Sequence, residues 1–287
     1  MAKSSKPKTE RRQIDGKKID SKLKSRNPVI KFDELQIYMG LPHTIDLEGI
    51  NGKITVYSPT MGQAIQLGFD RFYGGVNPFI ANTTMYRLPL WEMGVDWNEI
   101  ADFDLFCILL QSGLDKEVTD LFFDKGIDWT KFQLVAKYDE DGNAKKSLYN
   151  EESDIEIDEN VYFHLSQYIR KVVMREPEEK ITTDAGMKQA FIMKDKRHKA
   201  NMEAMAESGE ESGMSIQSLI STCVNHPGFK YKKSEIMEIG INEFFDSVKR
   251  LQIYESAVAS LHGAMGGMID SSKLPKDSMN IFREIHE

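Results

Sequence analysis

The chain has 287 residues, of which 40% are hydrophobic and 29% are charged, and its formal net charge at pH 7 is −8. This length is enough for one large domain or two small ones, so a substantial core needs no disulfide staples. No apolar run approaches the length of a membrane span, and the first residues lack the apolar segment of a secretory signal, so we expect neither a transmembrane helix nor a leader.

The charged residues are unevenly distributed along the chain. Residues 1–26 contain ten Lys or Arg and three acidic residues, and the rest of the chain is strongly acidic. A basic segment without aromatic residues is typical of a disordered arm, which we expect over residues 1–27. The arm could contact nucleic acid or an acidic partner, but the acidic body makes nucleic acid unfavoured as a partner. Its candidate contact residues are Lys17, Lys18, Lys22, Lys24 and Arg26.

Residues 28–150 are predicted to form an α+β domain. A first strand is expected at residues 29–37. Further along, Asn51-Gly52 lies between two runs of alternating apolar residues. Because Asn-Gly between such runs is the strongest short signal for a β-hairpin, we expect one over residues 45–57.

Helical periodicity predicts several short helices in the same half of the chain. Thr60 is a candidate N-cap, and Gly74-Gly75 is expected to stop the helix that Thr60 begins. The other helices are expected at residues 77–91, 102–111 and 116–123, and a second hairpin is expected from residues 127–135 and 145–149, on either side of residues 139–143.

Residues 151–213 are expected to hold an acidic loop, charged helices and a linker. The carboxylates of residues 151–159 lack the spacing and the glycine of an EF-hand, so they predict a solvated loop rather than a cation site. Residues 207–213 have the polar, Gly- and Ser-containing composition of a linker. Helices are expected at residues 161–174 and 185–205, the second with a weak apolar face of Met187, Ala190, Phe191 and Met193.

Residues 214–287 are expected to form a helical C-terminal domain with one long amphipathic helix. Apolar residues recur at spacings of three and four from residue 234 to 261, which places a nearly continuous apolar stripe on one helix face. Ser234 is its candidate N-cap, and a glycine cluster at residues 263–267 is expected to end it. The predicted fold class is therefore α+β, with a mixed N-terminal half of β-hairpins and short helices and a mainly α-helical C-terminal half.

The sequence contains no recognised motif for catalysis, for a cofactor or for a metal ion. None of the six histidines belongs to an HxxxH or HExxH pair, and Cys223-x-x-His226 lacks a second pair of ligands. Cys107 and Cys223 lie in apolar helical segments and are expected to be buried free thiols. We therefore expect a protein that is not an enzyme and binds no cofactor or metal ion. Core packing is expected for the three tryptophans, Trp91, Trp97 and Trp129.

Three stretches resemble tail-morphogenesis proteins of tailed phages that infect Gram-positive bacteria. They are residues 54–97, residues 223–231 (CVNHPGFKY) and residues 240–284, where DSVKRLQIYESA is followed by GGMIDSSKLPKDSMNIFRE. Such small proteins, encoded just before the tape-measure protein, are described as tail assembly chaperones. The resemblance implies a non-enzymatic protein that binds the tape-measure protein or other tail or baseplate proteins, in the host cytoplasm during assembly or in the virion.

The apolar residues of the long helix and of the segment after it are the candidate partner-binding residues. Docking of a tape-measure helix through apolar burial is the expected mode, and self-association is a further option. Two alternatives stay open: a permanent structural subunit of the tail or baseplate, and a nucleic-acid-associated regulator that uses the basic arm. The candidate residues are Phe244, Val248, Leu251, Tyr254, Val258, Leu261, Met265, Met268 and Phe282.

Overall fold

The computed structural model describes residues 27–48, 50–138, 144–208, 215–275 and 277–285. The five basic-arm residues and the predicted hairpin turn at 139–143 lie outside these ranges, as does most of the predicted linker. The fold class is α+β, as expected, with a helical C-terminal half and two small antiparallel sheets in the N-terminal half. Within the described ranges, no helix combines the length and the apolar character that crossing a membrane requires.

The elements follow one another as mostly short segments. The helices are α2 (Glu34–Tyr38), α3 (Met61–Leu67), α4 (Phe69–Ile80), α5 (Arg87–Glu92), α6 (Asp102–Gln111), α7 (Lys116–Phe122), α8 (Glu159–Val172), α9 (Ala185–Ser208), α10 (Ile216–Asn225) and α11 (Ile241–Met265), with 3₁₀ turns at η1 (Trp129–Lys131) and η2 (Ser271–Lys273). The strands are β1 (His43–Ile45), β2 (Ile54–Val56), β3 (Gln133–Tyr138), β4 (Ala144–Asn150) and β5 (Ile155–Ile157).

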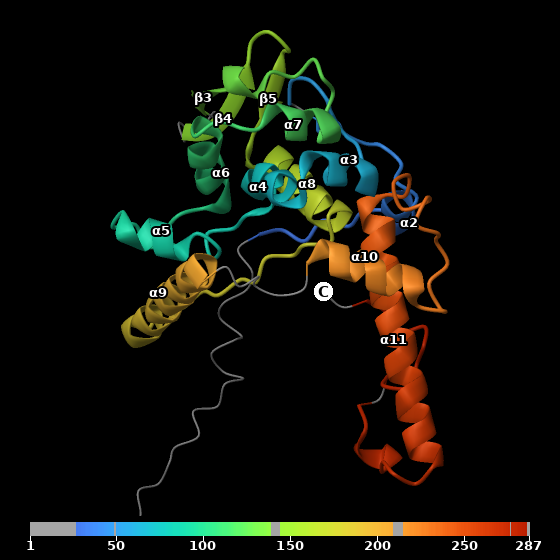
Figure 1. The fold of residues 1–287 in the computed structure, drawn as a ribbon. Coiled ribbons are helices and arrows are strands. Elements are labelled where there is room, and N and C mark those ends of the chain that lie inside the picture. The colour runs from blue at the N-terminus through green and yellow to red at the C-terminus, as the bar shows by residue number, and fades with distance from the viewer. Residues whose placement is uncertain (1–26, 49, 139–143, 209–214, 276, 286–287) are drawn as a thin grey trace, which may run out of the picture.

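The core lies around α4 and α8, which pack at the centre with α3, α6 and α7 around them (Figure 1). Aromatic side chains fill much of it: the Phe106 and Tyr162 rings stack with centroids 5.0 Å apart, and Phe79 meets Trp129 edge to face. Such pairs add to the stabilisation that apolar burial gives. One cluster of buried apolar residues extends from Ile37 to Val248, so the first turns of α11 belong to this same core.

The predicted first strand at residues 29–37 is wrong. Residues 28–33 have no regular structure, and α2 follows them. The Asp33 carboxylate accepts hydrogen bonds from the Leu35 and Gln36 amides, at 2.9 and 3.2 Å. This N-cap begins a helix where apolar alternation alone indicated a strand.

The first predicted hairpin is confirmed as a strand pair but not as a tight turn. β1 pairs antiparallel with β2, with Ile45 opposite Ile54, and residues 46–53 connect them. Gly52, at φ +77°, lies in this connection rather than at a two-residue turn. The connection packs on β5, where the Glu156 amide donates to the Asn51 carbonyl over 2.9 Å. The connection is therefore held by a contact with a distant strand, and it does not form the expected tight turn at Asn51-Gly52.

Thr60 is the N-cap of α3, as the sequence indicated, and it also forms a capping box with Gln63. The predicted stop at Gly74-Gly75 is wrong, because α4 continues through both glycines and contains Pro78. At Gly75 an added Cβ would lie 2.7 Å from a methyl group of Val118. The glycine therefore allows α7 to pack closely against α4 and does not end the helix.

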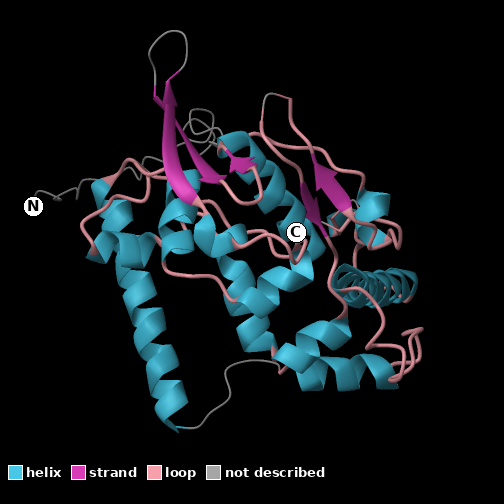
Figure 2. Cartoon of the chain, turned by 90° about the horizontal axis from the view of Figure 1, so that it is seen from above, coloured by secondary structure: helices cyan, strands magenta, loops and turns pink. Residues whose placement is uncertain are grey.

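The second hairpin is confirmed as a strand pair, since β3 pairs antiparallel with β4, but its first strand begins at Gln133 rather than Ile127, after η1. Figure 2 shows this hairpin extending from the body of the molecule. The acidic loop predicted at residues 151–159 is wrong in part, because it contains β5, which pairs with β4. Ile155 and Ile157 point into the core, and even Glu156 is buried. A strand of three residues is too short for its alternation to be recognised among carboxylates.

Helix α9 packs against α5 at one side of the body, as the elements in Figure 1 show. Its anchor is Ile192, which is buried with Trp97 in a small separate cluster. The Arg87 guanidinium pairs with Asp195, and Lys188 pairs with Asp96. The apolar face expected from Met187, Ala190, Phe191 and Met193 is wrong in part, because Phe191 packs against this cluster and the other three residues are exposed. Trp91 is also exposed, although it was expected in the core.

The long C-terminal helix exists, but it begins seven residues later than predicted. Residues 234–240 form turns, Ser234 caps no helix, and α11 begins at Ile241. This segment lies against the start of α3, where the Met61 amide donates to the Ile239 carbonyl over 2.9 Å. The Ile241 amide in turn donates to the Pro59 carbonyl. Hydrogen bonds to another element therefore hold these residues out of the helix.

Candidate protein-binding surface

The second half of α11 projects from the body, as Figure 1 shows. The N-terminal end of the helix is buried: Phe244 is 0% exposed and Val248 is 8% exposed. These two predicted partner-binding residues are core residues and are not available to a partner in the folded chain. Phe244 and Val248 are buried because residues 236–240, which precede α11, hold the start of the helix inside the core.

The other predicted residues of α11 lie on an accessible stripe. Leu251 and Val258 are half-buried, and Tyr254, Leu261 and Met265 are exposed. Their spacing of three, four, three and four residues places them along one face of the helix. We call these five residues the α11 stripe.

A glycine turn reverses the chain at the end of α11. The Met268 amide donates to the Gly263 carbonyl over 2.9 Å, and the Gly267 amide donates to the Ala264 carbonyl over 3.2 Å. With Gly267 at φ +69°, these bonds form a Schellman motif, which satisfies carbonyls that the helix end would leave unpaired. The chain then runs back alongside the helix (Figure 1). Met268 remains 88% exposed at the tip.

The returning segment, residues 269–285, makes few polar contacts with the helix. The Arg250 guanidinium donates to the Arg283 carbonyl over 2.8 Å, close to the body. Ile269 packs on Gly263 at the other end. Phe282, a predicted partner-binding residue, is 84% exposed and therefore accessible, as expected.

We call the second half of α11, together with the segment that runs back alongside it, the projecting arm. A groove of about 850 Å³ lies where this arm leaves the body of the molecule. Leu251, Tyr254 and Phe282 line it, which brings three of the predicted residues together in space. Sequence reasoning missed the rest of its wall, because many of those residues come from distant parts of the chain, although Arg250 lies on α11 itself. The missed residues are mainly aromatic or charged, and they include Tyr38, Phe229, Lys230, Tyr231 and Arg250.

Hydrogen bonds fix the wall of the groove. The Tyr231 hydroxyl donates to the Glu243 carboxylate over 2.6 Å, and this bond raises the pKa of Tyr231 to about 12. The Phe229 ring contacts the Tyr231 ring edge to face. Burial raises the pKa of the Asp246 carboxyl, against the opposing effect of Arg250. The groove is therefore a preformed aromatic surface with charged residues at its edge, which suits a protein segment better than a small polar ligand.

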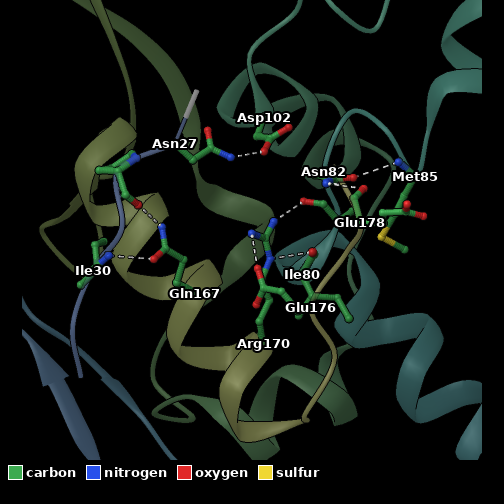
Figure 3. A network of polar contacts seen from close by, with 12 residues as sticks. Asn27, Ile30, Ile80, Asn82, Met85, Asp102, Gln167, Arg170, Glu176 and Glu178 are labelled. Carbon is green, nitrogen blue, oxygen red and sulfur yellow. Dashed lines mark hydrogen bonds and ion pairs between the residues drawn. The ribbon is translucent and has the colours of Figure 1, made fainter. Parts of the chain in front are cut away.

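A buried polar network near α8 is a second candidate site, shown in Figure 3. Arg170, 5% exposed, donates to the Ile80 and Ala81 carbonyls over 2.9 and 3.0 Å. Asp102 accepts from the Thr83 amide over 2.8 Å and from the Asn27 side chain over 2.7 Å. These groups bond to the backbone and to each other, so the network joins segments of the chain and leaves little for a substrate.

The network also explains how irregular segments are held in place. The Gln167 side chain donates to the Pro28 carbonyl over 2.6 Å and accepts from the Ile30 amide over 3.0 Å. The Asn82 side chain donates to the Glu178 carbonyl. Two loops on opposite sides of α8 are thereby attached to the core (Figure 3).

The two cysteines are buried and free, as predicted, and burial raises the pKa of the Cys107 thiol to about 11. Among the described residues, no group of three or more His, Cys, Asp or Glu side chains is placed to hold a metal ion. Comparisons with protein-family models, curated proteins and solved structures found no match. The α11 stripe and its groove are therefore the surface on which a functional argument can be built.

Proposed function

We propose that this chain is a non-enzymatic tail-morphogenesis protein of a tailed phage or prophage of Gram-positive bacteria. The observation that carries the proposal is the projecting half of α11, which presents the stripe Leu251, Tyr254, Val258, Leu261 and Met265 outside the core. The first turns of α11 are packed in the core, and packing of the core does not require the helix to extend beyond them. An apolar stripe on a projecting helix is suited to a second helix.

The partner in this proposal is a helix of the tape-measure protein or of another tail or baseplate protein. Its apolar residues would pack along the α11 stripe, and one of its side chains would enter the groove beside Tyr254. Burial contributes about 25 cal/mol for each Å² of apolar surface removed from water, less the cost of ordering both surfaces. Arg250 and Lys230 at the groove edge would select a partner segment with acidic residues nearby.

The proposal places the protein in the host cytoplasm during assembly, where a chaperone covers tape-measure helices and then leaves. The alternative of a permanent tail or baseplate subunit uses the same surface. The two differ only in whether the contact persists in the finished particle. The resemblance in residues 240–284 supports both, because that segment contains the stripe and the returning segment.

Mass spectrometry of gradient-purified phage particles and of the lysate that produced them tests the proposal. A chaperone is abundant in the lysate and absent from the particles. A structural subunit stays in the particles at a fixed copy number, which would support the alternative. If the particles form normally when the gene is deleted, the protein has no role in tail assembly and the proposal fails.

A further inference from the structure

A second groove lies between α10 and the junction of α3 with α4, and its volume is about 680 Å³. An added Cβ on Gly68, at the junction itself, would meet no atom within 4 Å, so the groove is open there. A groove of this size with apolar walls is typical of a site for a small ligand that has an apolar body. The walls are aliphatic or aromatic side chains from both sides, namely Ile65, Phe69, Ile216, Ile220 and Val224.

A smaller groove of about 470 Å³ adjoins this one, because Phe69 and Ile216 line both. Its lining adds two cations, Arg175 and Lys249, and one carboxylate, Asp70. Among the described residues, no carboxylate lines the larger groove. The two grooves therefore combine apolar walls with a net positive charge, in a chain whose formal net charge is −8.

The cations of the two grooves are not neutralised by neighbouring acids. Within the described ranges, neither Arg175 nor Lys249 forms an ion pair, and the same is true of Lys233, which lines the larger groove. The acidic residue closest in sequence to Lys249 is Asp246, which pairs with Arg250. An anionic group in the smaller groove would therefore meet two cations without having to break an existing ion pair.

The turn at the end of α8 holds Arg175 in place. The Arg175 amide donates to the Arg170 carbonyl over 2.9 Å, and the Met174 amide donates to the Lys171 carbonyl over 3.2 Å. Met174 has a φ of +50°, which is uncommon for a residue with a side chain and costs free energy. This turn sets the Arg175 guanidinium over the Tyr73 ring, with Cζ 3.9 Å from the ring centroid. Stacking uses the face of the guanidinium and leaves the N–H donors at its edge free for a carboxylate.

We propose that the two grooves form one binding site for a long-chain fatty acid, whose carboxylate binds Arg175 and Lys249 and whose acyl chain lies between Phe69 and Ile220. Arg175 and Lys249 exceed Asp70 by one positive charge, which the single charge of a carboxylate balances. A guanidinium binds a carboxylate through two parallel hydrogen bonds, and burial of the acyl chain supplies the rest of the affinity. The site shares no residue with the α11 stripe, so this inference does not rest on the proposed function.

Isothermal titration calorimetry of the full chain with decanoate, dodecanoate and tetradecanoate, each below its micelle concentration, tests the site. Each buried CH₂ group strengthens binding about fourfold, so the dissociation constant should fall roughly fifteenfold from one acid to the next. Dodecanol has the same chain without a charge and should bind about tenfold more weakly than dodecanoate. Absence of binding by tetradecanoate, or equal binding of dodecanol and dodecanoate, would overturn the proposal.

Removal of the two cations tests the position of the carboxylate. Arg175→Met with Lys249→Met should weaken dodecanoate binding by about tenfold and leave dodecanol binding unchanged. The matched control is Lys194→Met with Lys196→Met, two exposed cations on α9, which should change neither. Circular dichroism verifies that both double variants fold. Unchanged dodecanoate binding by the first variant, or an equal loss in the control, would overturn the assignment.

A last pair of variants tests the position of the acyl chain. Ile220→Trp places a larger side chain in the groove beside α10 and should abolish dodecanoate binding. Tyr254→Ala changes the groove beside the α11 stripe and should leave dodecanoate binding at the wild-type level. The reverse result, with binding lost in Tyr254→Ala and kept in Ile220→Trp, would place the fatty acid in the other groove and overturn the proposal.

Discussion

The backbone amide of Gly62 donates a hydrogen bond to the Met237 carbonyl over 3.1 Å, where the first turn of α3 meets the segment before α11. A side chain on Gly62 would collide with the Met237 backbone. This contact and the neighbouring bond from Met61 to Ile239 hold residues 236–240 in turns. The position of the projecting arm relative to the core therefore depends on two residues that are far apart in sequence.

Replacing Gly62 should destabilise the fold. Gly62→Ala forces apart two backbone segments, and we expect it to lower the free energy of unfolding by about 2–3 kcal/mol. The matched control is Gly74→Ala in α4, where an added Cβ meets no atom within 4 Å. Because alanine favours the helix over glycine, the control should raise stability by roughly 0.5–1 kcal/mol. Urea denaturation measures both, and an unchanged midpoint for Gly62→Ala would contradict the contact.

Phe244 and Leu261 lie on the same helix but should respond differently to truncation. Phe244→Ala removes a ring that is 0% exposed and should cost about 3–5 kcal/mol of stability. Leu261→Ala removes a side chain that is 44% exposed and should cost less than about 1 kcal/mol. Thermal unfolding of both variants makes the comparison. A Phe244→Ala protein as stable as the wild type would show that this end of α11 is not in the core.

Local signals predicted much of the fold, because their causes are local. The N-cap at Thr60, the end of α6 at Ser112 and the pairing of β3 with β4 all depend on residues close in sequence. The errors arise where a distant segment decides the outcome. Gly75 lies inside α4, where the close approach of Val118 leaves no room for a side chain, and no local pattern reveals this reason for a glycine.

The sequence predicted the helical stripe of the candidate site but not the groove beside it. The part of the stripe from Leu251 to Leu261 follows from spacing, whereas Met265 was expected after the helix and lies in its last turn. Spacing also cannot tell where the core ends along a single helix. Phe244 and Val248 fit the same pattern and are buried. The groove could not be predicted, because Tyr38 and Phe229 join α11 only through the tertiary fold. In the sequence, the groove was indicated only by the two aromatic residues of Gly228-Phe-Lys-Tyr231.

Arg170 should be essential for the order of the segment after α4. Arg170→Met leaves the Ile80 and Ala81 carbonyls without their donor, and we expect a loss of about 3 kcal/mol in the free energy of unfolding. The adjacent Lys171→Met serves as control, because that ammonium group pairs with the exposed Glu34, and losing such a surface pair should change stability by less than about 1 kcal/mol. Equal effects of the two variants in urea denaturation would argue against the network.

The bond from Tyr231 to Glu243 predicts a dependence of stability on alkaline pH. In the folded chain this bond raises the pKa of Tyr231 to about 12, above the value of about 10 in the unfolded chain. A raised pKa means that the contribution of the bond is complete below about pH 10 and is lost as pH rises through about 12. The stability difference between wild type and Tyr231→Phe should therefore shrink across that range. A constant difference in urea midpoints from pH 8 to pH 11.5 would contradict the bond.

Co-purification tests directly whether the α11 stripe binds a tail protein. The chain would be expressed with a tape-measure protein from the kind of phage proposed above, as wild type, as Leu261→Asp and as the control Met193→Asp on α9. Wild type and control should retain the tape-measure protein, and Leu261→Asp, although folded, should lose it. Retention by Leu261→Asp at the wild-type level, or no tape-measure protein with the wild type, would show that the α11 stripe does not bind this protein.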